Sequence, residues 1–219
     1  VAEPPEGFWE NPMDDESMKR LYFSSVGMYL LKKLPGNEGY VSDTTFLTNL
    51  EYRPGYAKQG CLTYFDQNGD IVKIVNGEDG KEYFPTDGDG WEWAKLNSRT
   101  SAFSIISLLH VADAHVTWGN IPGTAMRMFL PSDHPVRRAF SVHFFKTAYT
   151  VAQAHHALFA ELGVLHRSLP LKYKGGLHKA FEDLLKGFQF ELFPKFIKDR
   201  NLQDCTFHAG ATDGIELYN

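Results

Sequence analysis

Two histidines, His110 and His115, stand in an apolar run that contains no Gly or Pro between Trp91 and Trp118. Such a run predicts one helix that carries both side chains into a hydrophobic interior. Imidazole is a common ligand of zinc, copper, nickel and iron, so the pair is a candidate metal site. Spacing alone is a moderate signal, because residues five apart on a regular α-helix point about 140° away from each other.

A local widening of the helix would change this geometry. One π-turn would bring both rings to the same side, and such turns occur often at functional sites. Two alternatives need no metal: the histidines can be hydrogen-bonded core side chains, and His110 with Asp113 forms a better aligned pair on a regular helix. The choice between a metal site and ordinary core histidines therefore depends on the local shape of the helix.

Several other elements can be predicted around this helix. Alternating apolar residues on both sides of Asn68-Gly69 predict an antiparallel hairpin, with a short third strand in the EYF segment after Gly80. Residues 35–60 are rich in Gly, Pro, Asn and Thr and predict a connection with little regular structure. Helices are predicted at Asp14–Lys33, Pro135–Gly163 and Leu177–Phe190.

One helix face in this set has two interpretations. Phe140, Phe144, Val151, Ala154 and Leu158 lie on one side of the predicted helix 135–163. Such a stripe can line a lipid channel, but it is more often a core face, and we interpret it as core.

Composition limits the class of protein. The 219 residues are 43% hydrophobic and 14% aromatic, which predicts one well-packed domain. A net charge of −5 without a basic block argues against nucleic-acid binding, and no apolar run is long enough to span a bilayer. Cys61 and Cys205 are expected to be free thiols or at most one bridge. Residue 1 is Val, which a removed targeting peptide, a nicked precursor or a sequence given only in part would each explain; the compartment is unknown, and an organelle such as the plastid fits the first explanation.

Short motifs spread over nearly the whole chain resemble the catalytic domain of lipoxygenases. Each is weak alone, but together they keep the order and approximate spacing seen in that family. They are Asp14-Asp15-Glu16 with Ser25-Val26-Gly27, Gly60–Phe65 with Asn68-Gly69, Trp91 with Ala94 and Lys95, His110-x4-His115, Leu130-Pro131-x-x-His134-Pro135, His143-Phe144-x-x-Thr147 and Thr212–Tyr218.

The resemblance implies a fold. It is mainly α, part of a lipoxygenase-like helical catalytic domain with a small antiparallel β-hairpin at residues 61–75. Residues 1–219 would form a single, C-terminally truncated domain of this kind, with 1–13 as an extended arm. It also implies that His110 and His115 are metal ligands on an internal helix that is irregular between Ile106 and His115.

Departures from the family pattern limit what the site can do. The family motif I-N-x-x-A-R reads T-V-A-Q-A-H at residues 150–155 here and lacks both the Asn and the Arg. The family's later ligands, a His, an Asn or His and a C-terminal Ile carboxylate, have no counterpart before Asn219. Only two candidate iron ligands remain, and no residue is assigned a catalytic role.

Four functions compete on these observations. A complete lipoxygenase would need a third ligand, for which this chain offers only unplaced histidines such as His178 or His208. The chain can instead be one part of a split or nicked non-haem iron lipoxygenase that oxygenates polyunsaturated fatty acids. We favour a non-catalytic structural or lipid-contacting subunit of a larger, organellar membrane-associated assembly. A zinc hydrolase on His110, His115 and a carboxylate lacks the H-E-x-x-H glutamate.

Cofactors and partners follow from the favoured function. The isolated chain is expected to retain no cofactor, and iron is expected only where another chain completes the site. Other protein subunits and a lipid or fatty acid are the expected partners, with no nucleic acid and no transmembrane segment. The long predicted helices Trp91–Trp118 and Pro135–Leu162 are apolar over more than one stripe, so an exposed apolar face is expected.

Overall fold

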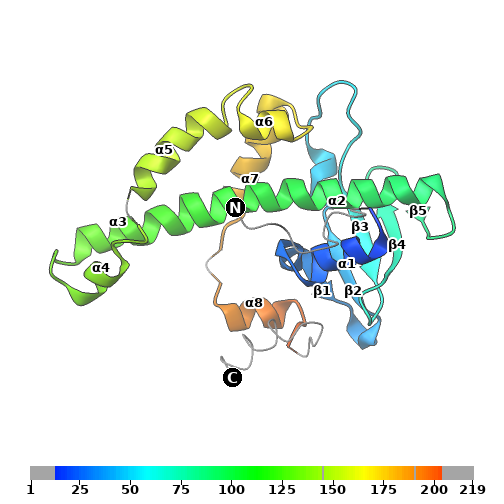
Figure 1. Ribbon diagram of the computed structural model, residues 1–219, viewed down its shortest axis with the longest axis horizontal. Helices are drawn as coiled ribbons and strands as arrows, with labels where there is room; N and C mark the ends of the chain where they lie inside the picture. Colours follow the sequence, from blue (N-terminus) through cyan, green and yellow to red (C-terminus); the bar gives the residue numbers. More distant parts are fainter. Residues whose placement is uncertain (1–12, 145, 190, 204–219) are drawn as a thin grey trace. The chain divides into compact units, whose positions relative to one another are not determined.

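A computed structural model describes residues 13–144, 146–189 and 191–203 (Figure 1). The chain divides into two compact units, one made of residues up to 49, residues 58–103 and residues from 189 onward, the other of residues 50–57 and 104–188. Helices dominate, and the sheet is antiparallel, which confirms the predicted fold class. The single domain over 1–219 stays a prediction, and the expected arm lies outside the described residues apart from Met13.

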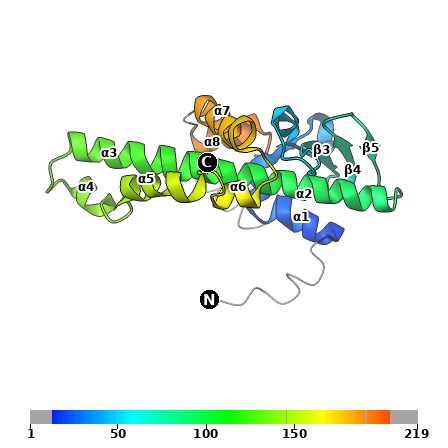
Figure 2. The same cartoon turned by 90° about the horizontal axis from the view of Figure 1, so that it is seen from above.

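The first unit contains a five-stranded sheet in the order β1-β2-β3-β4-β5, in which every neighbouring pair is antiparallel. The hairpin predicted at residues 61–75 is its β3–β4 pair, and the predicted third strand is β5. Figures 1 and 2 show α1 and the first part of α2 beside this sheet. The elements of the unit are α1 (Asp15–Phe23), η1 (Val26–Leu30), β1 (Leu31–Lys33), η2 (Pro35–Asn37), β2 (Tyr40–Asp43), η3 (Thr45–Asn49), β3 (Cys61–Phe65), β4 (Ile71–Asn76), β5 (Glu82–Tyr83), the beginning of α2 (Asp89–Leu109) and α8 (Phe193–Asp199).

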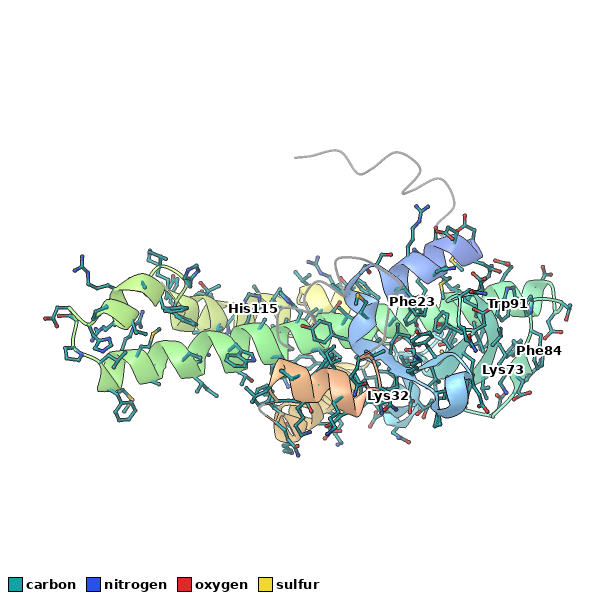
Figure 3. All side chains as sticks on the ribbon, turned by 90° about the horizontal axis from the view of Figure 1, so that it is seen from below. Phe23, Lys32, Lys73, Phe84, Trp91 and His115 are labelled. Carbon is teal, nitrogen blue, oxygen red and sulfur yellow. The ribbon has the colours of Figure 1, made fainter. Side chains whose placement is uncertain are left out.

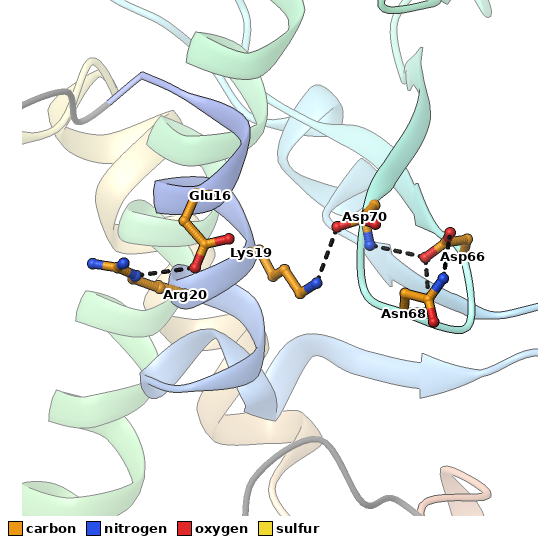
Figure 4. A network of polar contacts seen from close by, with 6 residues as sticks. All are labelled: Glu16, Lys19, Arg20, Asp66, Asn68 and Asp70. Carbon is orange, nitrogen blue, oxygen red and sulfur yellow. Dashed lines mark hydrogen bonds and ion pairs between the residues drawn. The ribbon is translucent and has the colours of Figure 1, made fainter.

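The turn of the β3–β4 hairpin is built from its own polar residues (Figure 4). Asp66 Oδ1 accepts the backbone N–H groups of Asn68 at 2.8 Å and Asp70 at 2.9 Å, and Gly69 has a φ of +82° that favours glycine. Lys19 of α1 forms an ion pair with Asp70 at 3.0 Å. The Asn-Gly signal was therefore sufficient to locate this turn.

The helix predicted for residues 14–33 ends early, at Phe23. A Cβ atom at Gly27 would lie 2.4 Å from the carbonyl oxygen of Leu21, so the chain approaches its own backbone there as only glycine allows. Leu31 then begins β1, and its side chain is buried. Residues 40–43, predicted to be irregular, form β2 between β1 and β3. Strands of three and four residues carry too little periodicity to be seen in a sequence.

The core of the first unit combines aromatic packing with a buried polar chain. Phe23 lies 5.2 Å from both Tyr40 and Phe65, measured between ring centroids (Figure 3). The hydroxyl groups of Tyr22 and Ser98 lie 2.9 Å apart, and Ser98 is hydrogen-bonded in turn to Thr63 of β3 at 2.7 Å. Burial raises the pKa of Tyr22 well above its ordinary value, so this hydroxyl stays protonated.

The second unit is helical. The helix that begins as α2 continues without interruption through η4 and α3. None of the helices in the described ranges has the length and apolar character that a bilayer crossing requires. After the last part of α2, the elements are η4 (His110–Trp118), α3 (Gly119–Phe129), α4 (Pro135–Phe140), α5 (Thr147–Leu158), α6 (Val164–Ser168), η5 (Tyr173–His178) and α7 (Lys179–Gly187).

The long helix predicted from Pro135 to Gly163 is two helices. α4 ends at Phe140, and α5 begins after Lys146, which has a left-handed φ of +56°. Between them the Phe144 ring packs so closely on α3 that a Cβ atom at Gly123 would lie 3.1 Å from Phe144 Cβ. Arg127 donates a hydrogen bond to the Phe144 carbonyl oxygen at 3.4 Å. Tertiary contacts with α3 therefore override the helical pattern of the sequence.

Candidate metal-binding site

The π-helix η4 determines the geometry of the two candidate histidines. Its hydrogen bonds run five residues back along the chain: the Gly119 N–H group donates to the Ala114 carbonyl oxygen. The buried hydroxyl of Thr117 follows the same register and donates to the Ala112 carbonyl oxygen at 2.9 Å. The predicted irregularity of this helix is confirmed, and it begins at His110.

The widened turn places the His110 and His115 side chains together. Their Nε2 atoms lie 3.1 Å apart, and the rings meet edge to face with centroids 4.8 Å apart. Both side chains are exposed, so the expectation that the helix carries them into a hydrophobic interior is wrong (His115 is labelled in Figure 3). The buried neighbours Val111 and Ala112 occupy the inner side of the same turn instead.

The two Nε2 atoms can serve one metal ion. Protein imidazole nitrogens bind metals such as zinc at about 2.0–2.1 Å. Two nitrogens 3.1 Å apart can both lie at that distance from one ion, with an angle of about 95° between the bonds. Without an ion, one neutral ring donates its Nε2–H to the other. His110 and His115 thus fit a pair of adjacent ligands, and their role as ligands remains a prediction.

The described residues supply no further ligand of the usual kind. Within residues 13–144, 146–189 and 191–203, no group of three or more His, Cys, Asp and Glu side chains is placed to hold a metal ion. His178, considered above as a third ligand, instead directs its Nε2 at the carbonyl oxygen of Phe159, 3.1 Å away. His208 lies outside the described residues.

A cavity of about 140 Å³ lies next to His115. Its walls come from η4, from α5 and from the residues that follow, and nearly all of them are apolar. This volume is close to that of a cavity known to accept benzene, so a short stretch of hydrocarbon fits it. The lining residues are Val111, His115, Val116, Thr150, Val151, Ala154, Leu158, Phe159 and Phe181.

The far wall of the cavity is fixed by ring packing. Phe159 and Phe181 of α7 pack against each other with ring centroids 4.3 Å apart and a tilt of 43°, and the hydrogen bond from His178 holds the Phe159 carbonyl group. Val151, Ala154 and Leu158, which sequence analysis assigned to a core face, line this cavity. Their spacing in the sequence was the signal that these three side chains share one side of the helix. Phe140, assigned to the same face, is exposed.

The fold of the chain is similar to that of known proteins. No family model matches the sequence. Among solved structures, the manganese lipoxygenase of Gaeumannomyces graminis, reported together with a partial zonadhesin structure of Komagataella pastoris, superposes with a TM-score of 0.73 at 21% identity. The match covers 90% of this chain and 41% of that chain. The chain has a lipoxygenase-like fold.

Two further lipoxygenase structures agree with this result. Both carry a deletion replaced by Gly-Ser, and one has an additional Trp substitution; they superpose with TM-scores of 0.68 and 0.71 at 17% and 16% identity. Each match covers 93% of this chain and 38% of the other. The lipoxygenase-like chain thus spans about two fifths of the length of the proteins it resembles.

Proposed function

We propose that this chain carries two protein ligands of a lipoxygenase-type metal centre, and that the remaining ligands come from outside its described residues. The observation that supports this most directly is the π-turn that brings the Nε2 atoms of His110 and His115 to 3.1 Å. A regular helix of the same sequence would direct the two rings apart. The proposed metal is iron or, as in the named manganese lipoxygenase, manganese.

The residues of the chain would have distinct tasks in such a centre. His110 and His115 bind the metal through Nε2, each as a neutral imidazole whose other nitrogen can donate a hydrogen bond. A redox-active metal held by these two residues and by the remaining ligands would supply the one-electron step of dioxygenase chemistry. Thr117 holds the turn in register through its bond to Ala112.

The cavity beside His115 suggests the class of substrate. Apolar walls exclude water and gain free energy by contact with hydrocarbon at about 25 cal/mol per Å². A volume of about 140 Å³ holds only part of a long acyl chain, so the rest would extend beyond it. We therefore propose that a polyunsaturated fatty acid is the substrate once the metal centre is complete.

Copper binding tests the site without any need for activity. Cu²⁺ is the first-row divalent ion that such nitrogen sites bind most tightly, so it reports an incomplete site sensitively. We expect the chain to bind one Cu²⁺ ion. The affinity of the chain for Cu²⁺ should fall at least about tenfold in His110→Ala and in His115→Ala. The matched control is His143→Ala, which removes an exposed histidine from the same unit. Copper affinity that is unchanged in both site variants would refute the site.

A second function is supported by a different observation. Large apolar side chains are exposed along the second unit, among them Trp118 at 46% and Ile121 at 61%. Such surfaces mark contacts with protein or lipid, which agrees with a non-catalytic subunit of an assembly. If the copper test fails while the chain associates with other proteins, this second function is the better one.

A further inference from the structure

The segment around α4 has a charge opposite to that of the chain as a whole. Residues 126–149 contain four cationic side chains and one acidic side chain, Asp133, for a net charge of +3, whereas the chain carries −5. Arg127 and Arg138 are exposed, and so is Lys146. This segment is therefore a local site of attraction for anions on a protein that otherwise repels them.

The same segment exposes a dense set of large apolar side chains. They come from the end of α3, from α4, from the turn after it and from the start of α5. Exposed apolar groups interspersed with cations are typical of segments that lie in the interface of an anionic membrane. The exposed fractions are 70% for Met128, 76% for Phe129, 47% for Val136, 48% for Phe140, 72% for Val142 and 64% for Tyr149.

Hydrogen bonds hold this segment in shape. Arg137 donates to the Leu130 carbonyl oxygen at 2.7 Å and closes the connection between α3 and α4. His134 Nδ1 accepts the Val136 N–H group at 3.2 Å and caps α4. In both ribbon views α4 lies at the end of the α3–α5 pair that is remote from α6 and α7 (Figures 1 and 2). The apolar side chains are thus presented by a folded helical hairpin.

We propose that these ten residues, which we call the basic-apolar tip, dock on an anionic lipid surface. The tip consists of the six exposed apolar residues above with Arg127, Arg137, Arg138 and Lys146. A lipid surface accounts for both features at once, because the cations meet acidic headgroups and the apolar side chains enter the acyl boundary. Docking of the tip on lipid does not require a metal ion at His110 and His115.

Vesicle flotation with the full chain tests the proposal. The probe is a vesicle of phosphatidylcholine with roughly one third phosphatidylglycerol, compared with phosphatidylcholine alone. We expect binding only to the anionic vesicles and weaker binding at high salt. Removing two charges with Arg138→Gln and Lys146→Asn should weaken binding roughly 25-fold, about fivefold for each charge. Asn is chosen at 146 because it tolerates the left-handed backbone there.

The apolar part of the tip has its own variant. Phe129→Asp should weaken binding roughly tenfold or more, because the aromatic side chain no longer enters the interface. Leu162→Asp is the matched control, since Leu162 is nearly as exposed and lies outside the tip. Arg167→Gln with Lys186→Gln removes two exposed charges elsewhere in the same unit and should change binding less than about twofold.

Hydrogen exchange on bound vesicles locates the contact. We expect slower exchange in peptides from residues 126–149 when anionic vesicles are present, with circular dichroism showing that every variant is folded. Failure to bind vesicles, protection confined to other segments, or full binding by the tip variants would each overturn the proposal. So would loss of self-association in the tip variants with unchanged vesicle binding, because the tip would then be a protein interface.

Discussion

Replacing Thr117 by Val should destabilise the π-turn and weaken metal binding together. The hydroxyl donates to the Ala112 carbonyl oxygen at 2.9 Å, the side chain is only 8% exposed, and this bond spans the five residues that define the register. Val keeps the shape and removes the hydrogen bond, which contributes about 1 kcal/mol to the free energy of unfolding. For a chain of this length that loss lowers the melting temperature by about 2–4 °C.

The effect on the metal is the more specific readout. Relaxation of the turn towards a regular α-helix would separate the His110 and His115 rings, so copper affinity should fall about 10- to 100-fold in Thr117→Val. Thr117→Ser keeps the hydroxyl and should restore most of that affinity. Thr100→Val removes a similar hydroxyl bond, to the Leu96 carbonyl oxygen at 2.9 Å in the regular part of α2, and should leave copper affinity unchanged. Equal affinities for Thr117→Val and wild type would refute the structural role of this hydroxyl.

Three further predictions concern packing and ionisation in the two units. Gly176→Ala would place a Cβ atom 2.4 Å from the carbonyl oxygen of Glu51, so it should lower the free energy of unfolding, measured with denaturant, by about 2–3 kcal/mol. The control is Gly187→Ala, whose Cβ atom meets nothing within 4 Å and which should not destabilise the protein. Tyr22→Phe removes one end of the buried chain of hydroxyl groups and should lower the free energy of unfolding by about 1–2 kcal/mol. An unchanged denaturant midpoint would contradict this. Burial raises the pKa of Cys61 above its ordinary value of 9.0, so the folded state keeps a proton that the unfolded state releases, and stability should fall as pH rises past that value. In Cys61→Ala, the urea concentration at the unfolding midpoint should fall less steeply as the pH rises above that value. An equally steep fall in the variant would exclude the thiol as its cause.

Elements defined by local chemistry could be predicted from the sequence. Asn68-Gly69 located the β3–β4 turn, because an Asn-Gly pair supplies the backbone that a tight hairpin needs. The Lys174-Gly175-Gly176 signal before a helix was also correct, although the turn there is the π-helix η5. These elements depend on residues within a few positions of each other, so a pattern in the sequence is enough.

Elements defined by distant contacts could not be predicted. The break between α4 and α5 depends on Phe144 packing against Gly123, and neither residue indicates the other in the sequence. The candidate site shows the same limit. Spacing alone left two alternatives open, a regular helix with the His110 and His115 rings apart and a π-turn with the rings together, and the resemblance to lipoxygenases favoured the π-turn that the structure contains. Exposure of the two rings depends on what surrounds η4, which the helix pattern does not encode.

The surroundings of the π-helix η4 constrain how further ligands can reach the proposed metal centre. Val111 and Ala112 are buried in η4, which α5 and α7 contact. The His110 and His115 side chains are exposed, although His115 also lines the cavity beside α5, and Trp118 and Ile121 further along the chain are exposed as well. Any segment that supplies further ligands has to come close to these exposed rings, because an ion bound by both Nε2 atoms must also be within reach of that segment. The segment that completes the ligand set would then also cover part of the exposed apolar surface. One partner segment would therefore supply the missing ligands and bury the exposed side chains.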